Sequence, residues 1–257
     1  MKLKNCIAKY EAFCPQNLAL ADDPVGLQIG SLDQEVKKIL VTLDIREQTV
    51  QEAIDLGVDM IFAKHPVIFR PLSALTAEDV QENIILQLAK ANMAVYTSHT
   101  NIDVVAGGLN DDFCQLLNLQ DVEALEAETG MARIGNIEPL SLSELTEKVK
   151  TAFGLKRLRV ISYDHQMNQE IKRVAICGGT GGKLWTLAKE QGADVFITGD
   201  IYYHTAHDML SHGLLAIDPG HYIEHLFVPK IAQFLREAEP ELEIFESQAL
   251  SNPFYDI

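Results

Sequence analysis

Histidines and carboxylates are the residues of this chain whose types and spacing could do chemistry. His221 and Glu224 stand three residues apart, so on a helix they would share a face and could reach one ion. His65 stands alone, whereas His99 and Asp103 belong to the sequence His-Thr-Asn-Ile-Asp. Imidazole nitrogen and carboxylate oxygen without thiolate suit zinc, iron(II), manganese, cobalt or nickel. A divalent ion there would make a coordinated water acidic enough to act as hydroxide near neutral pH.

Each of these patterns also has a purely structural interpretation. A lone histidine beside an apolar strand is more often a hydrogen-bonded structural residue than a ligand. The cluster of His204, His207 and His212 could be a solvated helix face. Asp200 could simply cap a helix that begins near Tyr203. Placement favours chemistry, because the candidates follow predicted strands and ligands collect at the carboxyl ends of strands in α/β sheets.

A glycine-rich segment at 178–182 lies between a predicted strand and a predicted helix. It lacks the spacing of a P-loop, and the register of a G-x-G-x-x-G motif also fails. A tight turn with several positive φ angles is one interpretation. The other is an anion loop at a helix N-terminus, formed by Gly178, Gly179, Gly181 and Gly182.

Alternating short strands and longer helices predict the α/β class. Runs of β-branched and apolar residues predict strands at 38–43, 60–63, 94–98, 159–163, 173–177, 195–198, 214–218 and 242–246. Helical periodicity predicts helices at 47–56, 79–91, 142–153, 183–191, 203–211 and 224–237.

Two of these stretches resemble each other. The strand that begins at residue 38 and the glycine at 57 recur at residues 173 and 192, an offset of 135 in both cases (173 − 38 and 192 − 57). We interpret this as two related, quasi-duplicated α/β modules at 1–125 and 126–257, with a C-terminal tail that could return to the first. The modules would stack, with a metal site in the cleft between them. Coincidence is the alternative, since a glycine commonly ends the helix of a βαβ unit.

The charge balance restricts the partners. Lys and Arg number 21 and Asp and Glu 37, giving a formal charge of −16 (21 − 37). This surplus argues against a nucleic-acid binder and against a polybasic membrane-surface protein. No apolar run of about 18 residues predicts a membrane span, and no signal peptide is apparent. Four widely spaced cysteines indicate free thiols in a reducing compartment, so we expect a cytoplasmic protein.

The order of motifs along nearly the whole chain resembles the GTP cyclohydrolase I type 2 homologue family, also called the Nif-three-like family of dinuclear metal proteins. Singly the motifs are modest, but in this order they are highly specific. They are DPVGLQIG at 23–30, KHPVIF at 64–69, SHTNID at 98–103, GGLND at 107–111, GGTGG at 178–182, TGDIYYH at 198–204 and DPGH at 218–221.

The resemblance implies two stacked α/β domains, a ring-shaped homohexamer and a dinuclear metal site. The positions that match the family's metal ligands are His65, Asp103, His221 and Glu224. His99 matches a histidine that lies near the metals, and we assign it, together with His204, to proton handling.

One departure from the family pattern concerns Lys64, which stands where the family has the first of two paired histidines. A charged ammonium has no lone pair and cannot ligate a metal. The resemblance assigns His65, Asp103 and Glu224 to one metal, and that set is complete. The second metal takes the missing histidine, His221 and the same glutamate. We therefore expect one firm divalent ion and a second site that is weakened or replaced by the Lys64 charge.

Two functions of different classes follow. The first is a metal-dependent hydrolase that acts on a small phosphorylated or nucleotide-like substrate; ring opening of GTP is suggested by the family name only. The second is a non-catalytic hexameric scaffold or metal carrier that binds a protein partner. A small anionic ligand suits either, whereas membranes and nucleic acid do not.

Overall fold

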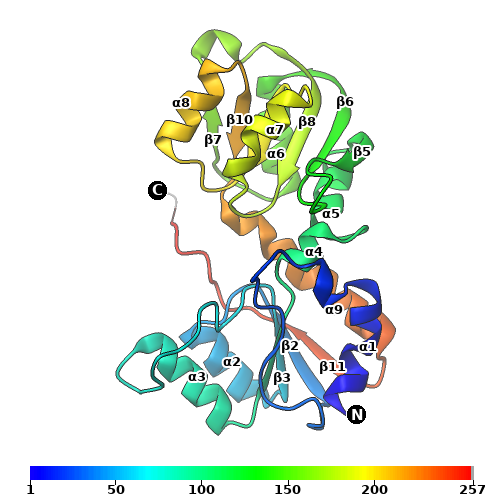
Figure 1. The fold of residues 1–257 in the computed structure, drawn as a ribbon, viewed down its shortest axis with the longest axis vertical. Helices are drawn as coiled ribbons and strands as arrows, with labels where there is room; N and C mark the ends of the chain where they lie inside the picture. Colours follow the sequence, from blue (N-terminus) through cyan, green and yellow to red (C-terminus); the bar gives the residue numbers. More distant parts are fainter. Residues whose placement is uncertain (256–257) are drawn as a thin grey trace. The chain divides into compact units, whose positions relative to one another are not determined.

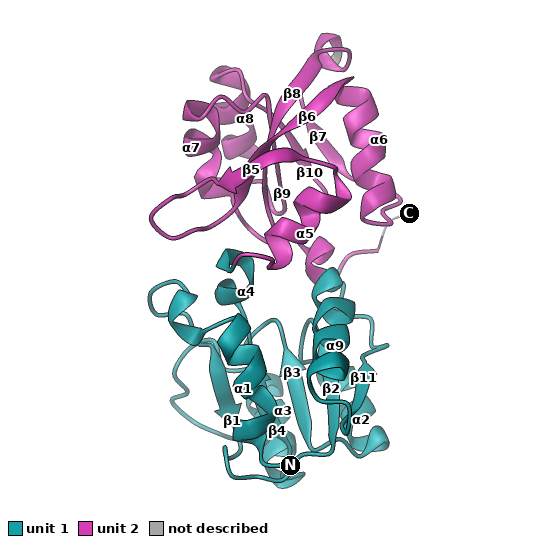
Figure 2. Cartoon of the chain, turned by 90° about the vertical axis from the view of Figure 1, so that its right-hand side faces the viewer, with its two compact units in different colours: residues 1–105, 225–253 teal, residues 106–224, 254–257 magenta. Residues whose placement is uncertain are grey.

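The computed structural model describes residues 1–255, residue 164 by its backbone alone. The chain separates into two compact units (Figures 1 and 2). Unit 1 comprises Met1–Val105 and His225–Pro253, and unit 2 comprises Ala106–Glu224 with the residues that follow Pro253. The chain thus passes into unit 2 after Val105 and returns to unit 1 after Glu224. Each unit holds one β-sheet with helices packed on it, as predicted for an α/β protein with two related modules.

Unit 1 contains a five-stranded sheet in the order β1-β4-β3-β2-β11. The strands β11, β2, β3 and β4 run parallel, and β1 is antiparallel to β4. The strands are β1 (Gly26–Ile29), β2 (Lys38–Thr42), β3 (Met60–Ala63), β4 (Ala94–Thr97) and β11 (Glu243–Glu246). The helices are α1 (Leu3–Phe13), η1 (Gln16–Leu18), α2 (Glu47–Leu56), α3 (Val80–Lys90), α4 (Thr100–Val104) and α9 (Phe227–Ala238).

The core of unit 1 lies on both faces of this sheet, because residues alternate between the two faces along each strand. On one face Phe62 and Tyr96 meet Tyr10 of α1, whose ring centroid lies 4.8 Å from that of Phe62. Phe227 of α9 packs on the same aromatic group. The opposite face carries the apolar side chains of α2 and α3. Because the sheet is covered on both sides, every residue of β3 and β4 is buried.

Unit 2 contains a six-stranded sheet in the order β5-β6-β8-β9-β10-β7. Its central strands β8, β9 and β10 are parallel, while β5, β6 and β7 join by antiparallel pairing. The strands are β5 (Gln120–Ala124), β6 (Arg133–Ser141), β7 (Arg159–Ile161), β8 (Glu170–Cys177), β9 (Val195–Thr198) and β10 (Leu215–Asp218). The helices are α5 (Leu109–Leu116), α6 (Leu142–Ala152), η2 (Asp164–Gln166), η3 (Gly182–Leu184), α7 (Trp185–Glu190) and α8 (Tyr203–Ser211), followed by η4 (His221–Leu226).

The repeat extends to individual hydrogen bonds of the two units. Asp59 Oδ2 accepts hydrogen bonds from the backbone N–H groups of residues 37–38, at 2.7 and 3.0 Å. Asp194 Oδ2, 135 positions later (194 − 59), accepts the matching pair from residues 172–173, at 2.8 and 2.9 Å. The preceding helix ends in both units at a glycine with a left-handed φ, +61° at Gly57 and +80° at Gly192. The same local interactions therefore close the same βαβ unit twice.

Strand register extends the correspondence to the third strand. Met60 of β3 pairs with Ala94 of β4, and Val195 of β9 pairs with Leu215 of β10. The offset is 135 for the first strand of each pair (195 − 60) and 121 for the second (215 − 94). Residues that follow β4 in unit 1 thus correspond to residues 121 positions later in unit 2.

Several elements differ from the sequence prediction. The helices α1, α4 and α5 and the strands β1, β5 and β6 were not predicted. These strands are short, half-exposed or interrupted by glycine and bulges. The helix predicted at 224–237 starts as the 3-10 segment η4 and becomes α-helical at Phe227.

All four cysteines are buried thiols outside any disulfide. Across residues 1–255 no helix combines the length and the apolar character that a membrane crossing needs.

Replacing the two matched aspartates tests the repeat. Asp59→Ala and Asp194→Ala should each lower the free energy of unfolding of their own unit by about 1–3 kcal/mol, because two backbone donors lose a charged acceptor. Circular dichroism in urea reports both units, while the fluorescence of Trp185, the only tryptophan, reports unit 2. Glu78→Ala, in an exposed loop, is the control and should change little. A negligible effect of either aspartate variant would contradict the equivalence.

Candidate metal-binding site

Unit 1 gathers its candidate residues at the carboxyl ends of parallel strands. Lys64 and His65 follow β3, and His99 follows β4 and precedes the short helix α4, which carries Asp103. Asp44 follows β2 in the same way. The strands run parallel and adjacent, so their carboxyl ends bring these side chains to one edge of the sheet.

A buried ion pair at this edge joins Lys64 to Asp103. Lys64 Nζ donates to Asp103 Oδ2 at 2.9 Å, and the two residues are 1% and 6% exposed. Burying either charge alone would be costly, so each requires the other. The carboxylate that the resemblance assigns to a metal therefore balances an ammonium in unit 1.

His65 is held by Asp44. The His65 Nδ1 atom lies 2.7 Å from Asp44 Oδ1, and the His65 ring meets the His99 ring edge-on at 5.7 Å. Burial alone would raise the pKa of Asp44, but the hydrogen bond and charge of His65 outweigh it and hold that pKa below its usual value. Asp44 was missed by sequence reasoning, although an acid directly after a buried strand is the same signal that singled out His65.

His99 has a similar partner in Asp23. The His99 Nδ1 atom lies 2.6 Å from Asp23 Oδ1, while Asp23 Oδ2 accepts the backbone N–H of Thr100 at 3.0 Å. Burial raises the pKa of Asp23, and the hydrogen bonds from His99 and Thr100 more than reverse this effect. Phe69, 58% exposed, lies edge-on to the His99 ring at 6.1 Å. The acid of the DPVG motif was not assigned a role from sequence.

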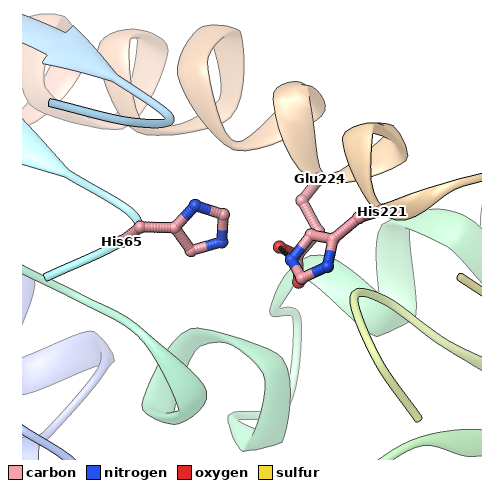
Figure 3. A group of neighbouring side chains, drawn as sticks. All are labelled: His65, His221 and Glu224. Atoms are coloured by element: carbon pink, nitrogen blue, oxygen red, sulfur yellow. Dashed lines mark ion pairs between the residues drawn. The ribbon is translucent and has the colours of Figure 1, made fainter. Parts of the chain in front are cut away.

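In unit 2 the 3-10 segment η4 brings His221 and Glu224 together (Figure 3). The His221 Nε2 atom lies 3.1 Å from Glu224 Oε2, and Glu224 is 2% exposed. Residues three apart eclipse each other on a 3-10 helix, so the spacing of this pair suits its local structure. The hydrogen bond to Glu224 raises the pKa of His221 to about 9, against the opposing effect of burial. A metal ion that binds Nε2 would have to displace this proton.

The other ring nitrogen of His221 contacts Asp200. Asp200 Oδ2 lies 2.8 Å from His221 Nδ1 and also accepts the Thr180 hydroxyl at 2.6 Å. The alternative that Asp200 caps α8 is wrong, because the N-cap residue is Tyr202 and no side chain makes a capping hydrogen bond there. Asp200 has a left-handed φ of +55°, a conformation that a non-glycine residue rarely adopts.

The glycine loop at 178–182 packs against this histidine–glutamate pair. A Cβ atom on Gly179, whose φ is +58°, would lie 2.9 Å from Glu224 Oε1 and 3.3 Å from His221 Nε2. Glycine is thus required for the close approach of the backbone to the pair. Two N–H groups of the loop, from Gly178 and Gly181, already donate to side chains of unit 2. The role of the loop in binding an anion stays a prediction.

His204 lies on the exposed face of α8, with its ring edge-on to that of Tyr203 at 5.5 Å. His207 and His212 are exposed as well, as expected for a solvated helix face. Within the described part of unit 2, no contact joins His204 to the His221–Glu224 pair. The assignment of His204 to proton handling therefore stays a prediction from sequence.

The repeat relates the two sets of residues. Glu224 corresponds to Asp103 by the offset of the third strand (224 − 103 = 121), and both carboxylates are buried. Asp200 corresponds to His65 (200 − 65 = 135). Each unit therefore buries one carboxylate at the same place, but Lys64 binds it in unit 1 and His221 in unit 2.

The donor set fits a divalent ion. In unit 2, His221 and Glu224 offer an imidazole nitrogen and a carboxylate oxygen (Figure 3), and in unit 1 His65 offers a second imidazole nitrogen. Such nitrogen and oxygen ligands without thiolate are those of zinc, iron(II), manganese, cobalt and nickel sites. The backbone of Gly178 and Gly179 leaves space beside Glu224 that any larger residue would fill.

Comparisons with known proteins agree on one family. The family model described as Duf34/NIF3 (NGG1p interacting factor 3) matches residues 1–253. Proteins named GTP cyclohydrolase 1 type 2 homolog are 62% identical in Lactococcus lactis and 50% in Streptococcus pneumoniae, with full coverage of both chains. Among solved structures, a Bacillus cereus protein related to NIF3 has a TM-score of 0.93 at 27% identity, covering 100% of this chain and 99% of that one. Reduced HcgD from Methanocaldococcus jannaschii has a TM-score of 0.85 at 30% identity, covering 97% and 98%.

The Lys64–Asp103 pair can be tested by a double-mutant cycle. Lys64→Met leaves the Asp103 charge buried without its ammonium, so the free energy of unfolding of unit 1 should fall by about 3–5 kcal/mol. Lys64→Met/Asp103→Leu removes both charges and should recover most of this loss in urea unfolding. Lys4→Met, which breaks an exposed pair with Asp33, is the control and should change little. Losses that simply add in the double variant would contradict the pairing.

Proposed function

Because the chain belongs to the Duf34/NIF3 family, we propose that it is a metal-dependent hydrolase that acts on a small phosphorylated or nucleotide-like substrate. The observation that carries the proposal is the His221–Glu224 pair of unit 2, with the glycine backbone that leaves room beside it. Relatives at 62% and 50% identity bear the name GTP cyclohydrolase 1 type 2 homolog. The most specific form of the proposal is therefore opening of the purine ring of GTP.

The positions that match the family's metal ligands occur in both units, and the proposal assigns them to one metal centre. Asp103 lies two residues before the chain leaves unit 1, and Glu224 is the last residue before it returns. The resemblance assigned the firm divalent ion to His65, Asp103 and Glu224 and the weakened second site to His221. Because Lys64 already engages Asp103, the proposal revises this set: His65, His221 and Glu224 bind the firm ion, and Asp103 shares its carboxylate between this ion and Lys64. A bound divalent ion supplies Lewis acidity and lowers the pKa of a coordinated water.

The other residues of the proposed site hold protons and charge. The Nδ1 atom of His99 is hydrogen-bonded with Asp23, so in the proposal the Nε2 atom of that ring exchanges a proton with a substrate. His204 is the second candidate for this role. The Lys64 ammonium replaces part of the positive charge of a second metal and would favour an anionic substrate in an acidic protein.

The Lys64–Asp103 pair also favours a second candidate, a non-catalytic metal-binding scaffold or metal carrier. A carboxylate engaged by an ammonium is a poorer ligand, and a site with one ion activates water less well than a site with two. In both proposals the protein assembles as a homohexamer, an expectation that comes from the family resemblance.

Metal analysis tests the ligand assignment. Protein purified without added metal should contain about one divalent ion per chain, since Lys64 cannot act as a ligand while charged. His221→Ala and Glu224→Gln should lose this ion, measured by plasma mass spectrometry. His207→Ala, which removes an exposed histidine of α8, should keep it. Two tightly held ions in the unmodified protein would contradict the proposed count.

A substrate screen separates the two functions. Nucleotides and phosphoesters are incubated with the protein loaded with Mn²⁺, Zn²⁺ or Fe²⁺, and the products are followed by chromatography. Turnover that falls by at least about 100-fold in Asp103→Ala, a loss of roughly 3 kcal/mol in transition-state stabilisation, supports the hydrolase. Absence of turnover on every substrate by the loaded protein supports the scaffold. The mass of the native assembly measured on the same sample tests the hexamer.

A further inference from the structure

Three histidines of the chain share one arrangement that the donor set alone does not explain. In each, the Nδ1 atom lies within hydrogen-bond distance of an aspartate oxygen. The pairs are His65–Asp44 at 2.7 Å, His99–Asp23 at 2.6 Å and His221–Asp200 at 2.8 Å.

The aspartates of two pairs are themselves fixed in place. Asp200 accepts the Thr180 hydroxyl at 2.6 Å. The backbone carbonyl of Asp44 accepts the hydroxyls of Thr42 and Thr49, both at 3.0 Å, which holds the loop after β2. Each carboxylate therefore presents its oxygen from a constrained position, as a residue that orients another side chain must.

A neutral imidazole carries one proton, on either of its two nitrogens. A carboxylate beside Nδ1 keeps the proton there and leaves the lone pair of Nε2 to bind a metal, which also orients the ring and makes it a stronger ligand. In unit 2 the Nε2 atom of His221 indeed faces Glu224, the carboxylate of the donor set.

We propose that Asp44 and Asp200 are positioning residues of the metal centre, which fix His65 and His221 for binding through Nε2. The inference rests on the metal site of the proposed function. Each unit contributes one such pair, and in both the aspartate precedes the histidine by 21 residues (65 − 44 and 221 − 200). The pair of unit 2 lies one strand further along the repeat, because Asp200 occupies the repeat position of His65. Asp23 does the same for His99, which is not among the proposed ligands, and therefore serves as a matched control.

The test measures Zn²⁺ affinity of the full chain by competition with a chelating indicator. Asp44→Ala and Asp200→Ala should each bind Zn²⁺ about 10–100-fold more weakly. Asp44→Asn and Asp200→Asn should recover part of this loss, because an amide oxygen still accepts the N–H. Asp23→Ala should keep the unmodified affinity within about threefold, since the ring that it holds is not a proposed ligand.

Nitrogen-15 spectra of the histidine rings add a readout that a general loss of stability would not move. In the Zn²⁺-loaded protein, the rings of His65 and His221 should bind through Nε2 with the proton on Nδ1. Binding through Nδ1, or unchanged affinity in both alanine variants, would overturn the inference while leaving the metal site intact. Absence of Zn²⁺ binding by the unmodified protein would overturn the proposed function and the inference together.

Discussion

The rest of the site depends on one constraint, the need of a buried carboxylate for a positive partner. The repeat buries such a carboxylate in each unit, Asp103 in one and Glu224 in the other. In unit 1 the partner is Lys64, a cation that is covalently part of the chain. In unit 2 it is an imidazole, whose proton a metal ion can replace. The two related modules therefore balance a buried carboxylate in different ways, with a fixed ammonium in unit 1 and with an imidazole in unit 2.

In each unit, the fold brings the residues of the site to one edge of the sheet. Parallel strands deliver side chains to one edge of each sheet, and the paired aspartates of the repeat fix the βαβ unit that does so. In unit 2, glycine backbone lies against Glu224, and Asp200 contacts the histidine that pairs with it. A side chain at position 179 would collide with Glu224, so glycine is needed there. Asp200, whose side chain contacts His221, has a left-handed backbone conformation. Such a strained residue persists only where its surroundings hold it in place.

Much of this follows from the sequence. The α/β class, the offset of 135 and the strand-end placement of His65 and His99 were predicted, because apolar strands and the glycines that end helices leave strong local signals. The partners of those residues were not predicted. Which oxygen meets Lys64, or which acid holds a histidine, depends on loops brought together over 21 to 76 positions, and no local pattern encodes it. Asp200 illustrates the limit, since its position before a helix indicated a cap, whereas its side chain turns to a histidine.

The account is tested most directly by anomalous diffraction from crystals soaked in Mn²⁺. It predicts one manganese peak per chain, within bonding distance of His65, His221 and Glu224, with Lys64 Nζ still bound to Asp103. Two peaks per chain, or a Lys64 side chain displaced from Asp103 by a second ion, would contradict the claim that an ammonium of the chain stands in the place of a metal.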